Sequence, residues 1–220
     1  MATVVLGWLY ERLYHELAWA YDSISRLVSG GRWNDWGRSA LPYIVGTRVL
    51  DVGCGTGNFF ADLCRHGFQA TGVDLSGPML SRARVILARA GYRGRLVRAD
   101  ARFLPFRPES FDSATLTFPT SVIRDPTLWL ELGRIVRPGG RVVMVLGARS
   151  VGMRNGTIVD VVGKLTGRLI AEPITPTDRP AAHDLNLPIP AEFFAIQSVE
   201  IEVRGSLVSL IVATRGCDTN

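Results

Sequence analysis

The residues with the clearest chemical potential are an aspartate and the three glycines that follow it. Asp51 closes an apolar run, and glycines then occupy alternate positions, Gly53, Gly55 and Gly57. Glycine allows positive φ angles and lets a ligand approach the backbone closely. Residues 58–64 have a helix-like pattern, so the free N–H groups of a first helical turn would face that ligand. The pattern predicts a buried strand that turns sharply into a helix around a bound molecule.

A second acidic residue extends the pattern. Asp74 ends the apolar run at residues 70–73 and lies 21 positions after Gly53. A carboxylate at the end of a second strand can accept hydrogen bonds from two ribose hydroxyls, and Ser76 has the residue type of an N-cap for the helix that follows. The dinucleotide fingerprint requires a glycine where this sequence has Asn58. The ligand is therefore predicted to carry a ribose without being NAD.

Three further segments follow in an order that fits one sheet. Residues 96–101 have the pattern of a short strand that ends in an acidic residue, Asp100, beside Ala101, and a buried-strand pattern covers residues 113–118. Next, Pro-Gly-Gly at residues 138–140 separates a helical pattern from the apolar run 142–146. Proline cannot continue a helix and glycine permits the reversal, so we expect a helix to stop there before a fifth strand.

Taken in order, these motifs over residues 49–147 resemble the class I S-adenosylmethionine-dependent methyltransferases. The resemblance implies that Asp74 binds the ribose of S-adenosylmethionine, that Leu75 and Met79 flank the adenine, and that Asp100 accepts a hydrogen bond from the adenine amine. The full set of cofactor-binding residues that it implies is Asp51, Gly53, Cys54, Gly55, Thr56, Gly57, Asp74, Leu75, Met79, Asp100, Ala101, Thr117, Phe118 and Tyr21.

The predicted fold class is α/β: a doubly wound, seven-stranded, mostly parallel sheet with an antiparallel last strand and an N-terminal helical lid. Strand and helix patterns alternate as far as residue 147, which is typical of parallel sheets with right-handed crossovers. Residues 198–203 alternate polar and apolar, Arg204-Gly205 has the composition of a turn, and residues 207–214 are apolar, which predicts a terminal hairpin. We expect one methyltransferase domain over residues 1–220.

Residues 1–43 lie outside the cofactor motifs and hold four of the five Trp and four of the five Tyr. This aromatic surplus predicts a helical lid over the cofactor and an apolar substrate pocket lined by Tyr14 and Trp36. Tyr21-Asp22 matches a Tyr-Asp motif of small-molecule methyltransferases similar to the ubiquinone and menaquinone biosynthesis enzymes. The alternatives are a helix packed on the sheet and a helix in peripheral contact with a membrane, although the strongly basic polar face expected of the latter is missing.

A second segment outside the motifs, residues 148–192, is predicted to cover the substrate side. It combines a helical pattern at residues 157–169 with five prolines, and loops of this length in compact domains are usually functional or mobile. His183 lies within it as a candidate catalytic base, because histidine is the commonest general base; the alternative is a surface residue. Thr120, after the fourth strand, is the polar residue expected to face the pocket.

Net charge and cysteine content limit the partners and the cellular compartment that can be expected. The formal net charge is +5, and eight Arg but one acid lie between residues 82 and 107. A basic surface attracts nucleic acid or anionic lipid, but charge alone is weak support, and a solvated helix face accounts for it without nucleic acid. The three scattered cysteines form no disulfide or metal pattern. The sequence has no signal-peptide pattern and no apolar run of about 18 residues, so we expect a cytoplasmic protein without a transmembrane segment. No sequence pattern predicts its oligomeric state.

These observations predict an enzyme that transfers a methyl group from S-adenosylmethionine to a small, apolar or aromatic molecule. Transfer from a sulfonium is an in-line displacement that requires positioning more than a catalytic dyad. Residues 117–120, Thr-Phe-Pro-Thr, depart from the Asn-Pro-Pro-Tyr pattern of amino-group DNA and protein-glutamine methyltransferases. Two alternatives stay open: an RNA or protein methyltransferase, and a non-catalytic protein that binds S-adenosylmethionine.

Overall fold

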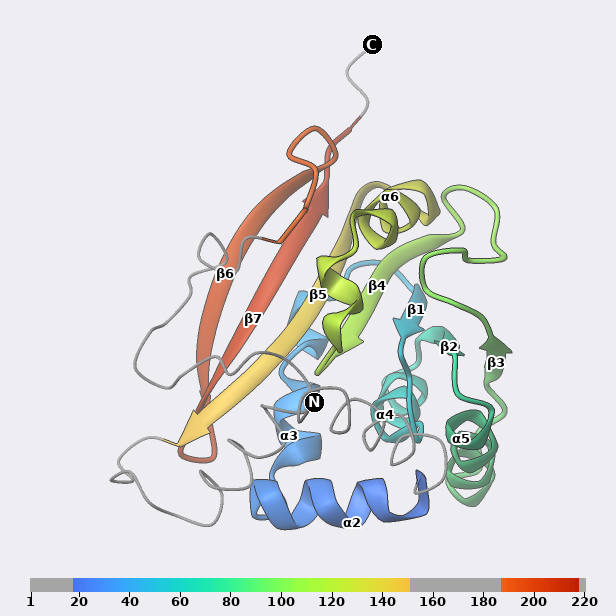
Figure 1. Ribbon diagram of the computed structural model, residues 1–220, viewed down its shortest axis with the longest axis vertical. Helices are drawn as coiled ribbons and strands as arrows, with labels where there is room; N and C mark the ends of the chain where they lie inside the picture. Colours follow the sequence, from blue (N-terminus) through green and yellow to red (C-terminus); the bar gives the residue numbers. More distant parts are fainter. Residues whose placement is uncertain (1–17, 151–186, 218–220) are drawn as a thin grey trace, which may run out of the picture.

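The computed structural model describes residues 18–150 and 187–217, which form a seven-stranded sheet flanked by helices (Figure 1). The strands are β1 (Arg48–Val52), β2 (Gln69–Asp74), β3 (Arg95–Arg98), β4 (Phe111–Thr117), β5 (Val136–Ser150), β6 (Phe194–Val203) and β7 (Ser206–Arg215). The helices are α2 (Ala18–Ser29), α3 (Trp33–Arg38), α4 (Asn58–Arg65), α5 (Gly77–Arg89) and α6 (Pro126–Ile135), with short 3-10 helices η1 (Leu41–Tyr43) and η2 (Ser121–Arg124).

The strand order β3-β2-β1-β4-β5-β7-β6 confirms the predicted seven-stranded, mostly parallel sheet with an antiparallel last strand. Strands β1 to β5 pair in parallel with their neighbours, and β7 pairs antiparallel with both β5 and β6. The chain proceeds from β1 outward to β3 and then returns to the other side of β1 with β4. The order therefore reverses between β1 and β4, which is where open α/β sheets bind their ligands, beyond the carboxyl ends of the strands.

The central strands are buried on both faces, so successive residues fill two different parts of the core. Leu50 and Met144 pack in a cluster with Trp129 of α6 on one face. Their neighbours Val49 and Val143 pack on the other face, in a cluster that includes residues of α3 and α4. Alternation along each strand sends side chains to opposite faces, and a parallel sheet covered on both sides requires such continuous apolar runs.

The terminal hairpin is formed as predicted. Val203 pairs directly with Ser206, which leaves the two-residue connection Arg204-Gly205. Both residues have positive φ, +49° and +74°, as expected for the tight hairpin turns whose twist matches that of the strands.

The predicted end of the helix at Pro-Gly-Gly was wrong. Helix α6 ends at Ile135, and Val136 already pairs with Phe111 as the first residue of β5. The pairing with β4 then resumes at Ser113 and Arg141, so residues 137–140 form an irregularity inside the strand. Proline lacks a backbone donor for the ladder, and it occurs at such bulges. Strand β3 is also shorter than expected: it ends at Arg98, and Asp100 lies beyond it.

A buried aspartate joins the amino ends of three strands. One carboxylate oxygen of Asp112 accepts hydrogen bonds from the backbone N–H groups of Thr47 and Arg48, both at 2.9 Å. The other accepts from the side chains of Arg48 and Arg137, both at 2.8 Å. The hydrogen bond from the Arg48 side chain, followed by the backbone donors and Arg137, holds the pKa of Asp112 well below its usual range. Asp112 thus ties β1 and β5 to β4.

Among the described residues no helix is both long enough and apolar enough to cross a membrane. The predicted helix at residues 157–169 lies outside the described residues.

Replacement of Asp112 by Asn should lower the free energy of unfolding by roughly 2–4 kcal/mol at neutral pH, because two guanidinium groups lose a buried charged acceptor. A carboxylate with a depressed pKa contributes stability above about pH 4, and this contribution is lost as the pH falls towards the lower folded-state pKa. The difference between the two proteins should therefore shrink at about pH 3. Denaturant titrations at both pH values measure it.

The matched control is Glu109→Gln. Glu109 is half exposed and pairs with Arg215 at 3.5 Å, so its replacement should change stability by less than about 1 kcal/mol. Equal losses in the two variants would contradict the role of Asp112.

Candidate functional site

The three glycines lie in the turn that joins β1 to α4, and this turn contacts the carboxyl end of β2. The N–H groups of Gly53 and Cys54 both donate to the carbonyl oxygen of Val73, at 2.8 and 3.0 Å. Gly53, Gly55 and Gly57 have φ angles of +70°, +52° and +83°, which side chains rarely tolerate. At Gly57 a Cβ atom would also lie 2.8 Å from the Cβ of Ala83 on α5. The third glycine is therefore required by helix packing as well as by the turn.

Asp74 holds this turn from the end of β2. One of its carboxylate oxygens accepts from the N–H of Gly55 at 2.9 Å, and the other accepts from the N–H of Ser76 at 2.8 Å. Asp74 is buried, yet each carboxylate oxygen can accept more than one hydrogen bond. Ser76 caps α5 as predicted, with its hydroxyl accepting from the N–H of Met79. The carboxylate is thus fixed in place at the end of β2.

Asp51, at the end of β1, has an unsatisfied oxygen. One carboxylate oxygen accepts from the hydroxyl of Thr115 at 3.0 Å. The other is buried and has no hydrogen-bond partner in the described part of the chain. Burial, together with the nearby charge of Asp74, raises the pKa of Asp51 to about 7. Native proteins rarely leave a buried carboxylate oxygen unpaired, so this atom indicates a place for a donor, and a positively charged donor would suit it best.

Cys54 and Thr56 complete the turn in different ways. Burial raises the pKa of the Cys54 thiol, and since the thiolate is the reactive form, the side chain is not a nucleophile. The hydroxyl of Thr56 donates to Asp22 of α2 at 2.7 Å. Figure 1 shows α2 crossing the end of the sheet where β4 and β5 finish.

Asp22 connects α2 to the site. Besides the Thr56 hydroxyl, its carboxylate accepts from the side-chain amide of Asn58 at 2.8 Å and from Arg82 of α5 at 3.3 Å. From the sequence, Tyr21 is expected in the site, and Asp22 has no predicted role. The Tyr-Asp pair carried the signal that could have identified Asp22. The side chain of Tyr21 lies outside the described residues.

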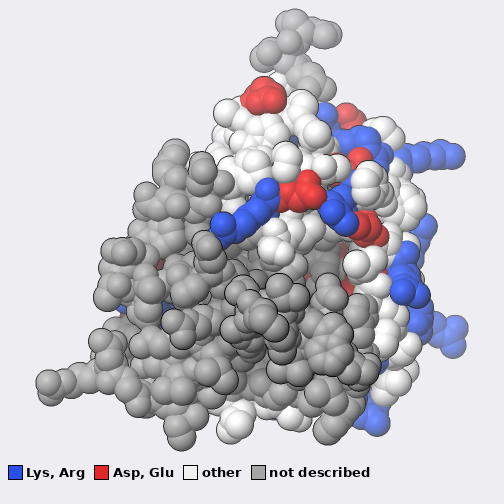
Figure 2. All heavy atoms as spheres, in the orientation of Figure 1, with Lys and Arg blue, Asp and Glu red and all other residues white. Residues whose placement is uncertain are grey.

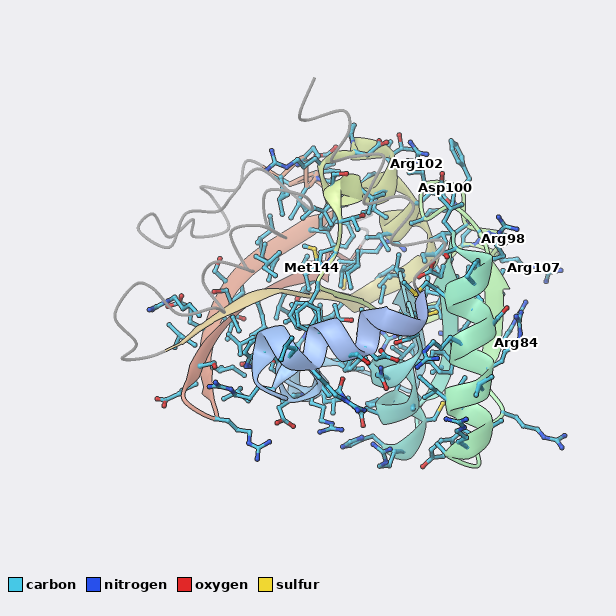
Figure 3. The ribbon with its side chains drawn as sticks, turned by 60° about the horizontal axis from the view of Figure 1, so that its bottom comes forward. Arg84, Arg98, Asp100, Arg102, Arg107 and Met144 are labelled. Carbon is cyan, nitrogen blue, oxygen red and sulfur yellow. The ribbon has the colours of Figure 1, made fainter. Side chains whose placement is uncertain are left out.

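At the end of β3, Asp100 is held by Arg102 (Figure 3). Two nitrogens of the Arg102 guanidinium group reach the two carboxylate oxygens, at 2.6 and 3.0 Å, and this pairing lowers the pKa of Asp100. Ala101 is half-buried beside it. Of the two expected adenine neighbours, Leu75 is 57% exposed and Met79 is buried. This rim of the site therefore offers Leu75 as apolar surface and Asp100 as a carboxylate already engaged by an arginine.

Aromatic side chains gather at the end of β4. The ring of Phe118 lies against Trp33 of α3, with centroids 4.0 Å apart, and Trp33 lies 6.2 Å from Trp36. Phe118 has φ of +52°, an uncommon conformation that in folded proteins clusters at functional sites. The buried indole N–H of Trp36 has no partner among the residues that the structure describes. Trp33, which the sequence analysis did not single out, is thus part of an aromatic wall beside Thr117 and Phe118.

The structure brings most of the predicted site residues to one end of the sheet. Asp51, the glycine turn and Asp74 meet at β1 and β2. Asp100 and Ala101 lie beyond β3, Thr117 ends β4, and Phe118 and Thr120 follow it. Trp36 is buried in the cluster of α3 and α4. Tyr14 and His183 lie outside the described residues.

Comparison with known proteins places this geometry in a family. Residues 49–140 match the family described as "Methyltransferase domain". A demethylmenaquinone methyltransferase of Clavibacter sepedonicus is 36% identical over 136 residues, which cover 60% of this chain and 55% of that protein. A ubiquinone/menaquinone biosynthesis C-methyltransferase of Geotalea daltonii is 32% identical over 144 residues, or 61% of each chain. The chain thus spans a little over half the length of these curated relatives.

Solved structures agree with the fold. The PH0226 protein of Pyrococcus horikoshii superposes with a TM-score of 0.60 at 20% identity, covering 84% of this chain and 91% of that one. The strand order and the glycine turn between two buried aspartates agree with these matches: residues 49–140 are similar to the methyltransferase-domain family, and the sheet has the class I methyltransferase fold.

Proposed function

We propose that this chain transfers a methyl group from S-adenosylmethionine to a small apolar or aromatic molecule. The observation that carries the proposal is the unpaired, buried oxygen of Asp51 at the end of β1. S-Adenosylmethionine has an ammonium group, which would provide the positively charged donor that this oxygen lacks. The cofactor therefore fits the donor set of the site.

The other residues of the turn would hold the rest of the cofactor. Asp74 would accept hydrogen bonds from the two ribose hydroxyls, as a carboxylate at the end of a second strand can, and the glycines leave the backbone open to close approach. Leu75 would cover the adenine with apolar surface, while Asp100 and Ala101 would meet its edge. Each of these assignments gives a residue of this chain the cofactor-binding role that the family resemblance implies, where the position of the residue supports that role.

The chain's contribution to the reaction would be positioning and exclusion of water. When bound, the cofactor supplies an activated methyl group on a positively charged sulfur. The protein must then align an acceptor with that methyl group and keep the site dry. The carboxylates of Asp51 and Asp74 add negative charge near a cationic ligand. Residues 1–43 are proposed as the lid, with Tyr14 as a pocket-lining residue, and residues 148–192 as the substrate-side cover. Thr120 and His183 are the proposed polar residues of the pocket, and His183 is the candidate base.

The acceptor class follows from the aromatic wall. The rings of Trp33 and Phe118 lie together at the end of β4, where the acceptor would lie, and aromatic rings favour flat apolar partners. The relatives are named for methylation in quinone biosynthesis. We therefore infer a quinol-like or other aromatic acceptor for this chain. The free thiols of Cys54, Cys64 and Cys217 support our placement of the protein in a reducing compartment, the cytoplasm.

A panel of acceptors tests this function directly. Labelled S-adenosylmethionine is incubated with the protein and with phenols, quinols, carboxylates, amines or RNA, and label transfer is measured. We expect transfer to the aromatic acceptors. The Asp74→Ala variant is the negative control, because loss of charged hydrogen bonds of about 1.5–3 kcal/mol each should weaken cofactor binding tenfold or more. Cofactor binding without transfer to any acceptor would indicate a binding protein, and transfer to RNA alone would reject the proposed acceptor.

The role of Asp51 predicts a pH dependence of cofactor binding. Its pKa in the free protein is raised to about 7, and an ammonium group beside it would favour the ionised form. Affinity for S-adenosylhomocysteine should therefore rise about tenfold from pH 6 to pH 8, because at pH 6 binding must first release a proton. Calorimetry in two buffers of different ionisation enthalpy should detect release of about one proton at pH 6.

Asp51→Asn should bind more weakly and lose this dependence. The control is Asp100→Asn: the pKa of Asp100 is lowered, so its carboxylate stays ionised over this range and the slope should persist. The same slope in Asp51→Asn as in the native protein would show that Asp51 does not face the ammonium group.

The link between α2 and the turn predicts a loss of function on removal of Asp22. Asp22→Ala takes the acceptor from Thr56, Asn58 and Arg82 at once, so we expect methyl transfer to fall roughly tenfold or more. Ser23→Ala, the exposed neighbour on the same helix, should leave the rate unchanged. Rates are compared after thermal melts have verified that both variants fold. Native rates in Asp22→Ala would show that α2 is not part of the site.

A further inference from the structure

A cleft opens at the opposite end of the sheet, where β1 to β4 begin. Its volume is about 610 Å³, and its walls come from the first residues of β1, β2 and β4 and from the segments before β3 and β4. The glycine turn and the two aspartates lie at the other ends of these same strands. The cleft is therefore separate from the proposed methyl-transfer site.

Four arginines line this cleft: Arg48, Arg93, Arg95 and Arg107. No Asp or Glu is among its lining residues in the described part of the chain. Arg48 pairs with Asp112, but Asp112 is shared with Arg137, so this group of three keeps one net positive charge. Arg93 and Arg107 have no acidic partner within residues 18–150 and 187–217, and the nearby Glu109 pairs with Arg215. The cleft thus concentrates positive charge that its own walls do not neutralise.

The charge belongs to a wider basic edge. Figure 2 shows Lys and Arg side chains gathered along the side of the molecule that carries α5 and β3 in Figure 1. Figure 3 shows Arg84, Arg98 and Arg107 along this side. Arg84 is on α5 and does not line the cleft. The basic edge therefore contains arginines that line the cleft and arginines that lie outside it, so ligand binding can be compared between variants of the two groups.

Aromatic rings hold one of the cleft arginines in place. The guanidinium carbon of Arg95 lies 5.7 Å from the centre of the Phe106 ring, in the range of a cation–π contact. Phe106 in turn meets Phe111 edge to face, with centroids 5.0 Å apart and an interplanar angle of 84°. Gln69, Thr71 and Ser110 add neutral hydrogen-bonding groups to the walls. Part of the basic lining is thus oriented before any ligand arrives.

We propose that this cleft binds a small anion that carries at least two phosphate groups, such as a diphosphate compound. Guanidinium groups form paired, charge-assisted hydrogen bonds with phosphate oxygens, and several arginines around one concavity require more than one anionic group to neutralise them. A volume of about 610 Å³ is within the range of small-molecule sites, about 300–1,000 Å³. The inference does not depend on the proposed methyl transfer.

The shape and the aromatic groups favour a small molecule over a polymer or a membrane. Single-stranded nucleic acids bind to exposed aromatic faces on which bases stack, whereas Arg95 lies over the Phe106 ring and Phe111 meets it edge to face. Anionic lipid surfaces attract basic residues over a broad face, whereas these four arginines surround one concavity together with neutral and aromatic groups. The cleft therefore fits a discrete ligand.

The test is calorimetric titration of the full chain with inorganic pyrophosphate and tripolyphosphate at about 0.15 M salt, where diffuse charge is largely screened. We expect saturable binding with one molecule per chain. The double variant Arg93→Gln, Arg107→Gln should weaken it tenfold or more. The matched control Arg84→Gln, Arg89→Gln removes the same charge from α5, outside the cleft, and should stay within about twofold of the native affinity. Thermal melts check that both double variants remain folded.

Three results would overturn the proposal. Absence of saturable binding would show that the cleft is not a site. Equal weakening in the two double variants would assign binding to the basic edge as a whole. Tighter binding of an RNA oligonucleotide, or of vesicles containing phosphatidylglycerol, with equal sensitivity to both double variants would assign the surface to a polymer or a membrane. Methyl transfer is measured separately with the acceptor panel, so failure of either proposal leaves the other intact.

Discussion

The site depends on the two hydrogen bonds that Asp74 accepts from the backbone. They fix the glycine turn after β1 and the start of α5 to one carboxylate at the end of β2. They act together with the hydrogen bonds from Gly53 and Cys54 to the carbonyl oxygen of Val73, and this set holds a turn with three positive φ angles in one conformation. The same constraint places Asp74 near Asp51, and burial then raises the pKa of Asp51. The ionised form of Asp51 is thus destabilised by burial at the end of β1. Folded proteins keep such a locally unfavourable group mainly where a ligand compensates it.

The sequence allowed the fold and much of the site to be predicted because both depend on local patterns. Apolar runs ending in Asp51 and Asp74 identify parallel strands that are buried on both faces. The glycine spacing identifies the turn, and the Arg204-Gly205 turn identifies the final hairpin. Each of these signals lies within a few consecutive residues, where backbone sterics and residue type decide the outcome.

The features that were not predicted depend on contacts between distant segments. Asp22 meets Thr56 only because α2 crosses the end of the sheet, and Trp33 gains its role through stacking on Phe118. The helix end before Pro138 was misjudged because pairing of β5 with β4 begins before the proline and overrides the local signal. The arginine cleft likewise combines residues that precede or begin four different strands.

The short edge strand β3 has a consequence for association between copies of the chain. An unpaired strand edge can be extended by another strand, and proteins limit this with short edge strands and charged side chains. Strand β3 has four residues and carries Arg95 and Arg98, while the opposite edge strand, β6, carries the exposed Glu200 and Glu202. Arg95 therefore lines the cleft, and it also places a positive charge on an open edge of the sheet, which disfavours pairing with another strand. Apolar replacements on β3 would leave that edge open to intermolecular strand pairing and aggregation.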